Sequence, residues 1–306
     1  MTDVMTVRGP VEASTLGVTL PHEHVYLNLM LEYKKEGVLN DEVLALRELG
    51  QLVAAGCRTL VDCTSVELDR DPVALRRVAE ATGLNVVMGC GHYRDPYIDR
   101  DYLDRRGVDG LATDLVAEIR DGFEDTGIRP GIIGEVGSNR KWISSAEERA
   151  LRVAARASLA TGLTIMTHAA RWPLGIPQLD ILGEAGVDPR TVVVGHCDMV
   201  PSTEYHEAIA ARGAYVEFDT IRGENEYATS ARVDWVMNLA RKGRLEQILL
   251  AQDICLTTLY TAYGGQGYAF LFREFLPRLR AAGLDDGEIE TLVVHNPARM
   301  LTASTR

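Results

Sequence analysis

Short apolar runs rich in Val, Ile and Thr recur along the chain, and each is followed by a stretch with the periodicity of an amphipathic helix. Most of these runs lack the apolar–polar alternation of a half-exposed strand, which is typical of parallel strands covered on both faces. Eight strands are predicted on this basis: 17–24, 59–65, 85–91, 131–137, 164–168, 191–198, 214–220 and 247–254. Their carboxyl ends lie about 33 residues apart on average, roughly the 30 residues or more of one strand–helix–strand unit.

Helix-capping residues separate the predicted strands. Asp71 precedes Pro72, so a capping side chain stands before a proline at the first helical position. A later stretch opens with Ser145, has Glu148 three residues on, and ends at Gly162. The first two residues form the pattern of a capping box, and a glycine commonly ends a helix. These signals predict helices between consecutive strands.

Eight strand–helix units without a break in composition predict an α/β fold, a single closed (β/α)8 TIM barrel. In such a barrel the active site lies at the carboxyl ends of the strands. We expect residues 1–306 to form this one domain, with residues 1–16 as an amino-terminal extension packed on the barrel. A doubly wound open sheet is the alternative. That fold usually has a glycine-rich phosphate turn after its first strand, where this chain has His22-Glu23-His24.

Composition narrows the class of protein further. A hydrophobic fraction of 46% with 25% charged residues is typical of a globular protein. The net charge of −12 and the lack of a Lys/Arg cluster argue against a nucleic-acid partner. No run of 18 apolar residues predicts a membrane span, and the first residues lack the apolar core of a secretory signal, so we expect a cytoplasmic protein. Five scattered cysteines without a CxxC pair favour buried, reduced thiols.

Residue types that bind divalent metal ions gather at the carboxyl ends of the predicted strands. His22 and His24 form an HxH pair on the first strand, where the two-residue period points both side chains to one face. Four further candidates end the fourth, fifth, sixth and eighth strands: Glu135, His168, His196 and Asp253. A single histidine at a strand end is more often a hydrogen-bonded core residue than a ligand.

The complete set of six favours a metal centre. Four imidazoles and two carboxylates converging on one barrel mouth would each cost roughly several kcal/mol if they were buried without compensation. Two divalent cations supply that compensation. Neutral imidazoles suit zinc best, although manganese, cobalt and iron accept the same ligand types.

An ordered series of motifs, running from residue 8 to about residue 300, resembles the phosphotriesterase family of the amidohydrolase superfamily. The series is TLPHEH at 19–24, VDCT at 61–64, GEVG at 134–137, TH at 167–168, VGHCD at 194–198, FDT at 218–220 and GGQGY at 264–268. Within that family the chain is most similar to the phosphotriesterase homology proteins and the phosphotriesterase-related proteins.

The resemblance implies a role for each of the six residues. His22, His24 and Asp253 would hold a buried ion, and His168 and His196 a more exposed one. Glu135 would bridge the two ions. In phosphotriesterases and many related lactonases the bridge is a carboxylated lysine. Glutamate carries the same charge, but its carboxyl carbon lies closer to the backbone, which puts efficient phosphotriester hydrolysis in doubt.

The expected reaction is attack by a metal-bridging hydroxide on a carbonyl or phosphoryl centre. Asp253 would take the proton of the nucleophile and pass it to the leaving group. Asp62 is either a residue that orients a ligating imidazole or an acid that caps a loop. Tyr93 follows the third strand and would contact the bridging water or the substrate, or else simply pack on the loop.

Several cations follow predicted strands and therefore lie on the mouth side of the barrel: Arg94, Lys141, Arg171 and Arg222. In an otherwise acidic protein they could bind a carboxylate, sulfonate or phosphate of a substrate, or they could be solvated loop charges. The resemblance adds one indication: lactonases of long-chain acyl homoserine lactones carry a longer loop after the residue that corresponds to Asp253, so the short segment here implies a compact, polar substrate.

The leading hypothesis is therefore a binuclear metal hydrolase of carboxylic esters or lactones, with small anionic or phosphorylated sugar lactones among the candidates. An N-acyl amide hydrolase of the phosphotriesterase-related kind is the alternative. A phosphotriesterase side activity and a barrel that binds a ligand without turnover are weaker hypotheses. The expected partner is a small-molecule substrate, with neither nucleic acid nor membrane, and the resemblance is compatible with a homodimer.

Overall fold

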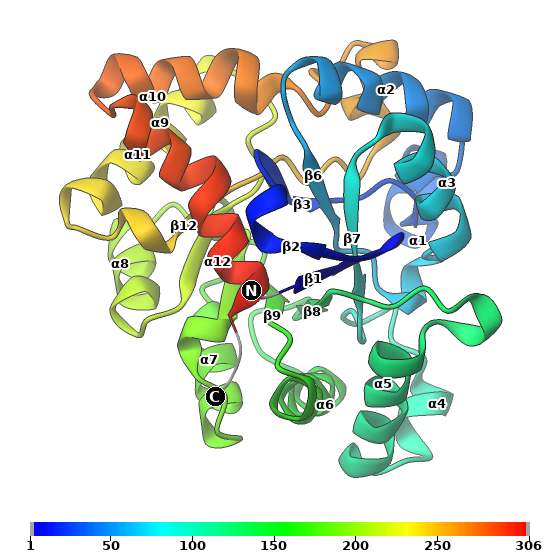
Figure 1. Cartoon of the computed structure of the whole chain (residues 1–306). Coiled ribbons are helices and arrows are strands. Elements are labelled where there is room, and N and C mark those ends of the chain that lie inside the picture. Colours follow the sequence, from blue (N-terminus) through cyan, green and yellow to red (C-terminus); the bar gives the residue numbers. More distant parts are fainter. Residues whose placement is uncertain (1–2, 304–306) are drawn as a thin grey trace.

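The computed structural model describes residues 3–303, and eight parallel strands form its central sheet (Figure 1). The strand order is β12-β11-β10-β9-β8-β7-β6-β3, so neighbours in the sheet follow one another along the chain. The strands are β3 (Thr19–Glu23), β6 (Thr59–Asp62), β7 (Asn85–Cys90), β8 (Ile132–Gly137), β9 (Ile165–His168), β10 (Val192–Gly195), β11 (Tyr215–Phe218) and β12 (Ile248–Leu250). The predicted (β/α)8 barrel is confirmed.

The seam between β12 and β3 is closed in part by a side chain. The Glu23 carboxylate accepts hydrogen bonds from the backbone N–H groups of Gln252 and Ile254, both at 2.8 Å. The backbone N–H of Asp253 donates to the carbonyl of His22 at 3.2 Å. A buried acid therefore joins the last strand of the barrel to the first.

Helices surround the barrel, and most of them connect one strand to the next (Figure 1). They are α1 (Met30–Tyr33), α2 (Glu42–Ala54), α3 (Pro72–Thr82), α4 (Arg100–Asp104), α5 (Val108–Asp121), α6 (Ser145–Thr161), α7 (Gly175–Glu184), α8 (Thr203–Ala211), α9 (Glu226–Arg241), α10 (Leu276–Ala282), α11 (Asp286–Glu290) and α12 (Asn296–Thr302). Two short strands, β4 (Leu27–Asn28) and β5 (Val38–Leu39), pair in the loop after β3.

The helix punctuation is confirmed with one shift. Asp71 caps α3, accepting from the N–H of Ala74, and Pro72 is the first helical residue. The capping box of α6 is formed by Ser144 and Glu147, one residue earlier than predicted. The run of two serines and two glutamates fits both registers, and the backbone selects Ser144 because that residue is still extended. Gly162 ends α6 in the left-handed conformation, as predicted.

The amino-terminal residues cover the lower end of the barrel. Strands β1 (Asp3–Thr6) and β2 (Gly9–Glu12) form a hairpin in front of the barrel strands, beside α12 (Figure 1). Val4 and Leu16 are buried in one cluster with side chains of the barrel interior: Val61, Cys63, Val87, Ile132, Met166, Val193 and Leu249. This apolar layer closes the barrel from below, so polar side chains nearer the strand ends face only the mouth.

The strands end earlier than the sequence predicts. The expected strand 191–198 stops at Gly195, and the expected strand 247–254 stops at Leu250. His196 and Asp253 lie just beyond these ends with positive φ angles of 57° and 46°. The backbone bends there because two side chains are aimed into the mouth instead of alternating along a strand. Within residues 3–303, no helix is long and apolar enough to cross a membrane.

Candidate metal centre

All six predicted ligands lie together at the barrel mouth, and each is at most 8% exposed. The strand register explains their positions. Met166 belongs to the interior apolar layer, so His168, two residues later on β9, also points inward. The pairing of β3 shifts register between Leu20 and Glu23, across His22. The pairing of β8 shifts between Ile133 and Val136, across Glu135. Such irregularities re-aim side chains.

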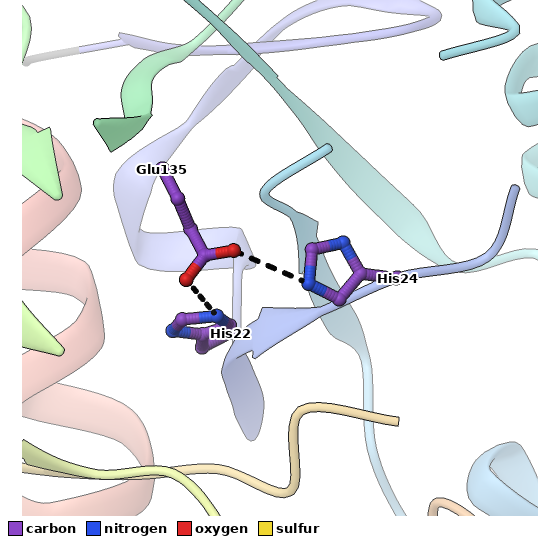
Figure 2. Close-up of side chains that lie close together, drawn as sticks. All are labelled: His22, His24 and Glu135. Atoms are coloured by element: carbon purple, nitrogen blue, oxygen red, sulfur yellow. Dashed lines mark ion pairs between the residues drawn. The ribbon is translucent and has the colours of Figure 1, made fainter. Parts of the chain in front are cut away.

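The Glu135 carboxylate lies among the four imidazoles. Its Oε1 atom is 3.3 Å from Nε2 of His22, 3.0 Å from Nδ1 of His168 and 2.8 Å from Nε2 of His196. Its Oε2 atom is 3.6 Å from Nε2 of His24. Figure 2 shows the two carboxylate oxygens turned toward the rings of His22 and His24. One carboxylate is thus shared by four imidazoles from the ends of three strands, β3, β9 and β10.

Two overlapping groups of donors meet at this carboxylate. His22, His24 and Glu135 place one ligand atom each within 4.8 Å of one another, and so do Glu135, His168 and His196. The Asp253 Oδ1 atom lies 3.2 Å from Nε2 of His24, on the side of the first group. The arrangement offers two adjacent cation positions with Glu135 common to both.

The donor chemistry fits divalent cations. Nε2 of His22 is fully buried and has no hydrogen-bond partner among the described residues. Nδ1 of His168 and Nε2 of His196 lie only 2.7 Å apart. Unpaired buried nitrogens and crowded lone pairs are costly unless a shared cation lies between them.

Carboxylates behind the rings orient the ligands. Nδ1 of His22 donates to Glu217 Oε2, and Nδ1 of His196 donates to Asp219 Oδ1, both at 2.8 Å. Nδ1 of His24 lies 2.8 Å from the Thr64 hydroxyl. A proton held on Nδ1 leaves the Nε2 lone pair of a neutral imidazole facing the mouth, which is the tautomer a metal ligand needs.

In a third group, formed by His22, His196 and Asp219, the possible ligand atoms also lie within 4.8 Å of one another. It lies on the far side of the two rings, where both Nδ1 atoms already donate to carboxylates. The Asp219 carboxylate also accepts the backbone N–H of His196 at 2.7 Å. With its donors paired in this way, the third group supports ligands and does not itself offer an open cation site.

Glu217, Asp219 and Thr64 were missed by the sequence analysis. For the two acids, the sequence does contain a pattern that could have identified them. Glu217 and Asp219 are two acids in the run YVEFD, at positions that share one face of an otherwise apolar strand. Charged residues inside a buried strand require partners, and the imidazoles of neighbouring strands are the ones available.

Asp62 does not orient an imidazole directly, which corrects one of the two predicted roles. Its carboxylate accepts from the backbone N–H groups of Val25 and Thr64, at 2.8 and 3.0 Å. It therefore acts as the loop-capping acid of the alternative interpretation. Its neighbour Thr64 is the residue that contacts the His24 ring.

The electrostatics keep both acids of the centre ionised. Burial alone raises the pKa of Glu135, but the positive charge of the surrounding imidazoles when they are protonated, His22 and His168 first, lowers it well below the usual range, and bound cations would take over this role. Burial likewise raises the pKa of Asp253, and the guanidinium of Arg222 together with the imidazoles of His24 and His196 outweighs that effect, so the pKa is lowered. Two ionised carboxylates are what a pair of cations requires.

The predicted substrate contacts differ in their availability. Tyr93 is buried with its hydroxyl 3.3 Å from Nδ1 of His168, beside the centre. Arg94 lines the cavity, but its guanidinium is bound by Glu32 at 2.6 and 3.2 Å and by Asn139. Arg222 binds the Asp253 carboxylate and donates to the Gln252 carbonyl at 2.7 Å. Arg94 and Arg222 are therefore used by the protein itself.

A small cavity of about 110 Å³ opens above the centre. Its floor includes His24, Glu135, His168, His196 and Asp253. Apolar side chains of Leu27, Leu29, Leu68, Met199 and Leu256 form part of its wall, and Arg171 also reaches it. A compact substrate fits such a space.

The fold and the site together give the class of this protein, a (β/α)8 barrel with two overlapping groups of possible metal-binding side chains at its mouth. The sequence model of the phosphotriesterase family matches residues 2–301. The chain therefore belongs to the phosphotriesterase family, whose members are hydrolases with a binuclear metal centre, and the resemblance seen in the sequence is confirmed.

Relatives agree with this assignment along nearly the whole chain. The phosphotriesterase homology protein of Escherichia coli is 32% identical over 284 residues, which are 92% of this chain and 97% of that protein. Its crystal structure, with phosphate in the active site, has a TM-score of 0.90 at 31% identity and covers 94% of this chain and 99% of the other. The N-acetyltaurine hydrolase of Dictyostelium discoideum is 26% identical over 364 residues, covering 98% and 97% of the two chains.

A crystal structure of a resiniferatoxin-binding protein from Rhodobacter sphaeroides has a TM-score of 0.92 and 35% sequence identity. It covers 99% of this chain and 95% of the other. The barrel and its family are thus supported by sequence and by three-dimensional structure.

Proposed function

We propose that this protein is a metal-dependent hydrolase of carboxylic esters or lactones with two zinc ions as its resident metals. The observation that carries the proposal is the Glu135 carboxylate shared by four buried imidazoles. Nitrogen donors with one or two carboxylates are the ligand set that zinc prefers, and manganese, cobalt and iron remain alternatives for elemental analysis to separate.

His22, His24 and Asp253 would hold one ion, and His168 and His196 the other, with Glu135 shared. When bound, the two ions lower the pKa of a water molecule toward neutrality and polarise the substrate carbonyl. Protein side chains would transfer the proton and orient the substrate.

Asp253 is placed to accept a proton during the reaction. Asp253 lines the cavity, and its Oδ1 lies 3.2 Å from Nε2 of His24, while Oδ2 is bound by Arg222. The ion pair holds the carboxylate in one orientation and keeps it ionised. Asp253 can then take the proton of the attacking water and deliver it to the leaving oxygen. The Tyr93 hydroxyl, beside His168, orients the substrate oxygen.

An N-acyl amide is the second candidate substrate, because one group of relatives bears the name N-acetyltaurine hydrolase. An amide requires protonation of a departing amine, whereas a lactone or an activated ester does not. The phosphate in the active site of the Escherichia coli relative supports an anionic substrate for either reaction. Phosphotriester hydrolysis would be a side activity only.

A panel of esters, lactones and N-acyl amides, assayed with zinc-loaded protein, tests the proposal. We expect ester and lactone hydrolysis that is abolished by a chelator and restored by zinc, with rates that depend little on the leaving group. Faster hydrolysis of N-acyl amides than of matched esters would favour the second candidate. No metal-dependent hydrolysis of any of the three classes would contradict both.

The role of Asp253 gives a sharper prediction. Asp253→Asn removes the proton acceptor but keeps the shape of the side chain, so kcat should fall by about a hundredfold or more, while the circular dichroism spectrum is unchanged. Asp234→Asn, an exposed change on α9, is the matched control. Near-normal turnover by Asp253→Asn with both ions bound would refute the role.

A further inference from the structure

The charges that line the cavity are nearly all paired. Arg94 is bound by Glu32, and Arg222 is bound by Asp253. Glu135 is surrounded by imidazoles, and the remaining acids of the lining, Glu32 and Asp253, are the partners already named. Each of these charges is therefore neutralised within the protein or by the metal centre.

Arg171 is the exception among these lining residues. It is exposed, and no hydrogen bond or ion pair reaches its side chain from residues 3–303. Its φ angle is 67°, a left-handed backbone conformation that residues other than glycine adopt at a cost of roughly 1 kcal/mol. A backbone held in this conformation places an unpaired guanidinium at the rim of the cavity.

A second cation contacts the residue after Arg171. The Lys141 ammonium lies 4.6 Å from the ring centre of Trp172. Lys141 follows β8, whose neighbouring residues Ser138 and Asn139 line the cavity with uncharged groups. In a chain with a net charge of −12, Arg171 is thus an unpaired cation at the cavity, and Lys141 is a second cation that contacts the adjoining Trp172.

We propose that Arg171 binds the anionic group of the substrate and makes the enzyme selective for compact substrates that carry a carboxylate, sulfonate or phosphate away from the bond that is cleaved. This inference rests on the hydrolase function proposed above and adds the substrate class. A guanidinium donates two parallel hydrogen bonds to such anions, and the paired Arg94 and Arg222 cannot do so without leaving Glu32 and Asp253.

The chain limits how long that substrate can be. Arg171 follows the candidate ligand His168 by three residues, so their Cα atoms are at most about 11 Å apart. Because Arg171 and the centre line the same small cavity, a short linker between the anion and the reacting carbonyl, such as a few methylene groups or one aromatic ring, is favoured. The cavity volume of about 110 Å³ agrees with that limit.

Two probes of the same shape test the proposal without depending on turnover. The dissociation constants of 4-hydroxybenzoate and its neutral amide, 4-hydroxybenzamide, are measured by calorimetry with the zinc-loaded protein. Hydrolysis of their acetyl esters, 4-acetoxybenzoate and 4-acetoxybenzamide, is measured in parallel. The ratio of the two dissociation constants, and likewise of the two hydrolysis rates, reports the effect of the negative charge, because the two probes have the same ring and nearly the same size.

We expect Arg171→Met to reduce the preference for the anion by about tenfold or more, as for one lost charge-assisted interaction. Arg171→Lys should retain part of the preference. Arg140→Met is the control, because Arg140 lies over Trp142 on the neighbouring loop, outside the cavity lining. It should change the ratio less than twofold. Metal content should be equal in all four proteins.

An unchanged ratio in Arg171→Met, or an equal loss in Arg140→Met, would overturn the inference. The binding measurement decides this even when the acetyl esters are not hydrolysed. Absence of ester hydrolysis together with an Arg171-dependent preference for the anion would instead count against the proposed reaction and support the binding role.

Discussion

At the scale of single residues, the centre depends on acids that no metal would touch. Asp219 accepts hydrogen bonds from the ring and from the backbone of His196, at 2.8 and 2.7 Å, and its Oδ2 lies 3.3 Å from Nδ1 of His22. It thereby contacts two predicted ligands, which the proposed centre assigns to different ions. The orientation of the imidazoles is thus set one layer behind them.

Asp219→Asn should weaken zinc binding by about tenfold to a hundredfold, since an amide keeps one oxygen acceptor where the carboxylate accepts from the ring and the backbone of His196 with two. The measurement is a competition titration with a chromophoric chelator. Asp121→Asn, at an exposed position on α5, is the control and should bind zinc like the unchanged protein. Equal affinity of Asp219→Asn and the unchanged protein would show that Asp219 does not position the ligands.

His206 shows how a histidine outside the centre behaves. His206, on α8, is buried, with its ring 5.0 Å from that of Phe218 and 5.4 Å from that of Trp235. Its Nε2 donates to the carbonyls of Cys197 and Val200. The register of the helix turns this position inward.

Burial lowers the pKa of His206, so the folded protein keeps it neutral where the unfolded chain, with a pKa near 6.5, takes up a proton. Stability from this residue is therefore complete above about pH 6.5 and decreases as the pH falls below that value. Urea unfolding should show that the stability difference between the unchanged protein and His206→Gln shrinks from about pH 8 to about pH 5.5. His295→Gln, at an exposed position, is the control. A difference that is constant with pH would contradict this.

At the scale of elements, the loop after β12 is held by a helix on the other side of the barrel seam. The buried Glu48 carboxylate on α2 accepts from the N–H and the hydroxyl of Thr261, at 3.0 and 2.7 Å, and from the N–H of Ala262 at 3.0 Å. The same loop supplies Cys255 and Leu256 to the cavity. Gly267 has room for no side chain there, because a Cβ atom would lie 2.9 Å from Glu48 Oε2.

Glu48→Ala should leave these donors without their acceptor and loosen the loop, at a cost of roughly 2 kcal/mol. Hydrogen exchange of residues 255–267 should become faster, and KM should rise several-fold while zinc content stays the same. Glu80→Ala, an exposed change on the adjacent helix α3, should alter neither. Unchanged exchange across this loop in Glu48→Ala would show that other contacts hold it.

The sequence predicted the elements better than their ends. All eight strands were recognisable because buried parallel strands form continuous apolar runs. The bends at His196 and Asp253 were not, because positive φ angles arise from side chains that converge across the barrel. The sequence also could not show which of Arg94, Arg171 and Arg222 is free to bind a substrate. Only the folded chain shows that Glu32 binds Arg94 and that Asp253 binds Arg222.

At the scale of the whole molecule, the barrel is divided into an apolar lower half and a polar mouth. The side chains of Val61, Met166, Val193 and Leu249 fill the interior below, and the four imidazoles lie above them. So many polar groups in a buried layer are stable only when a strong partner binds them. Bound metal should therefore stabilise the folded state, in addition to its role in the reaction.

Removal of metal tests this coupling. The chelated protein should have a lower Tm than the zinc-loaded protein, and added zinc should restore it, because zinc binds the folded state preferentially. Differential scanning calorimetry at several free zinc concentrations measures the dependence. A Tm that is independent of zinc would contradict the coupling between the centre and the fold.

Anomalous X-ray diffraction at the zinc edge, from crystals of the zinc-loaded protein, tests the proposed two-metal centre most directly. Two peaks are expected on either side of the Glu135 carboxylate, one beside His22, His24 and Asp253, the other beside His168 and His196. A single peak, no peak, or zinc bound by other residues would contradict it.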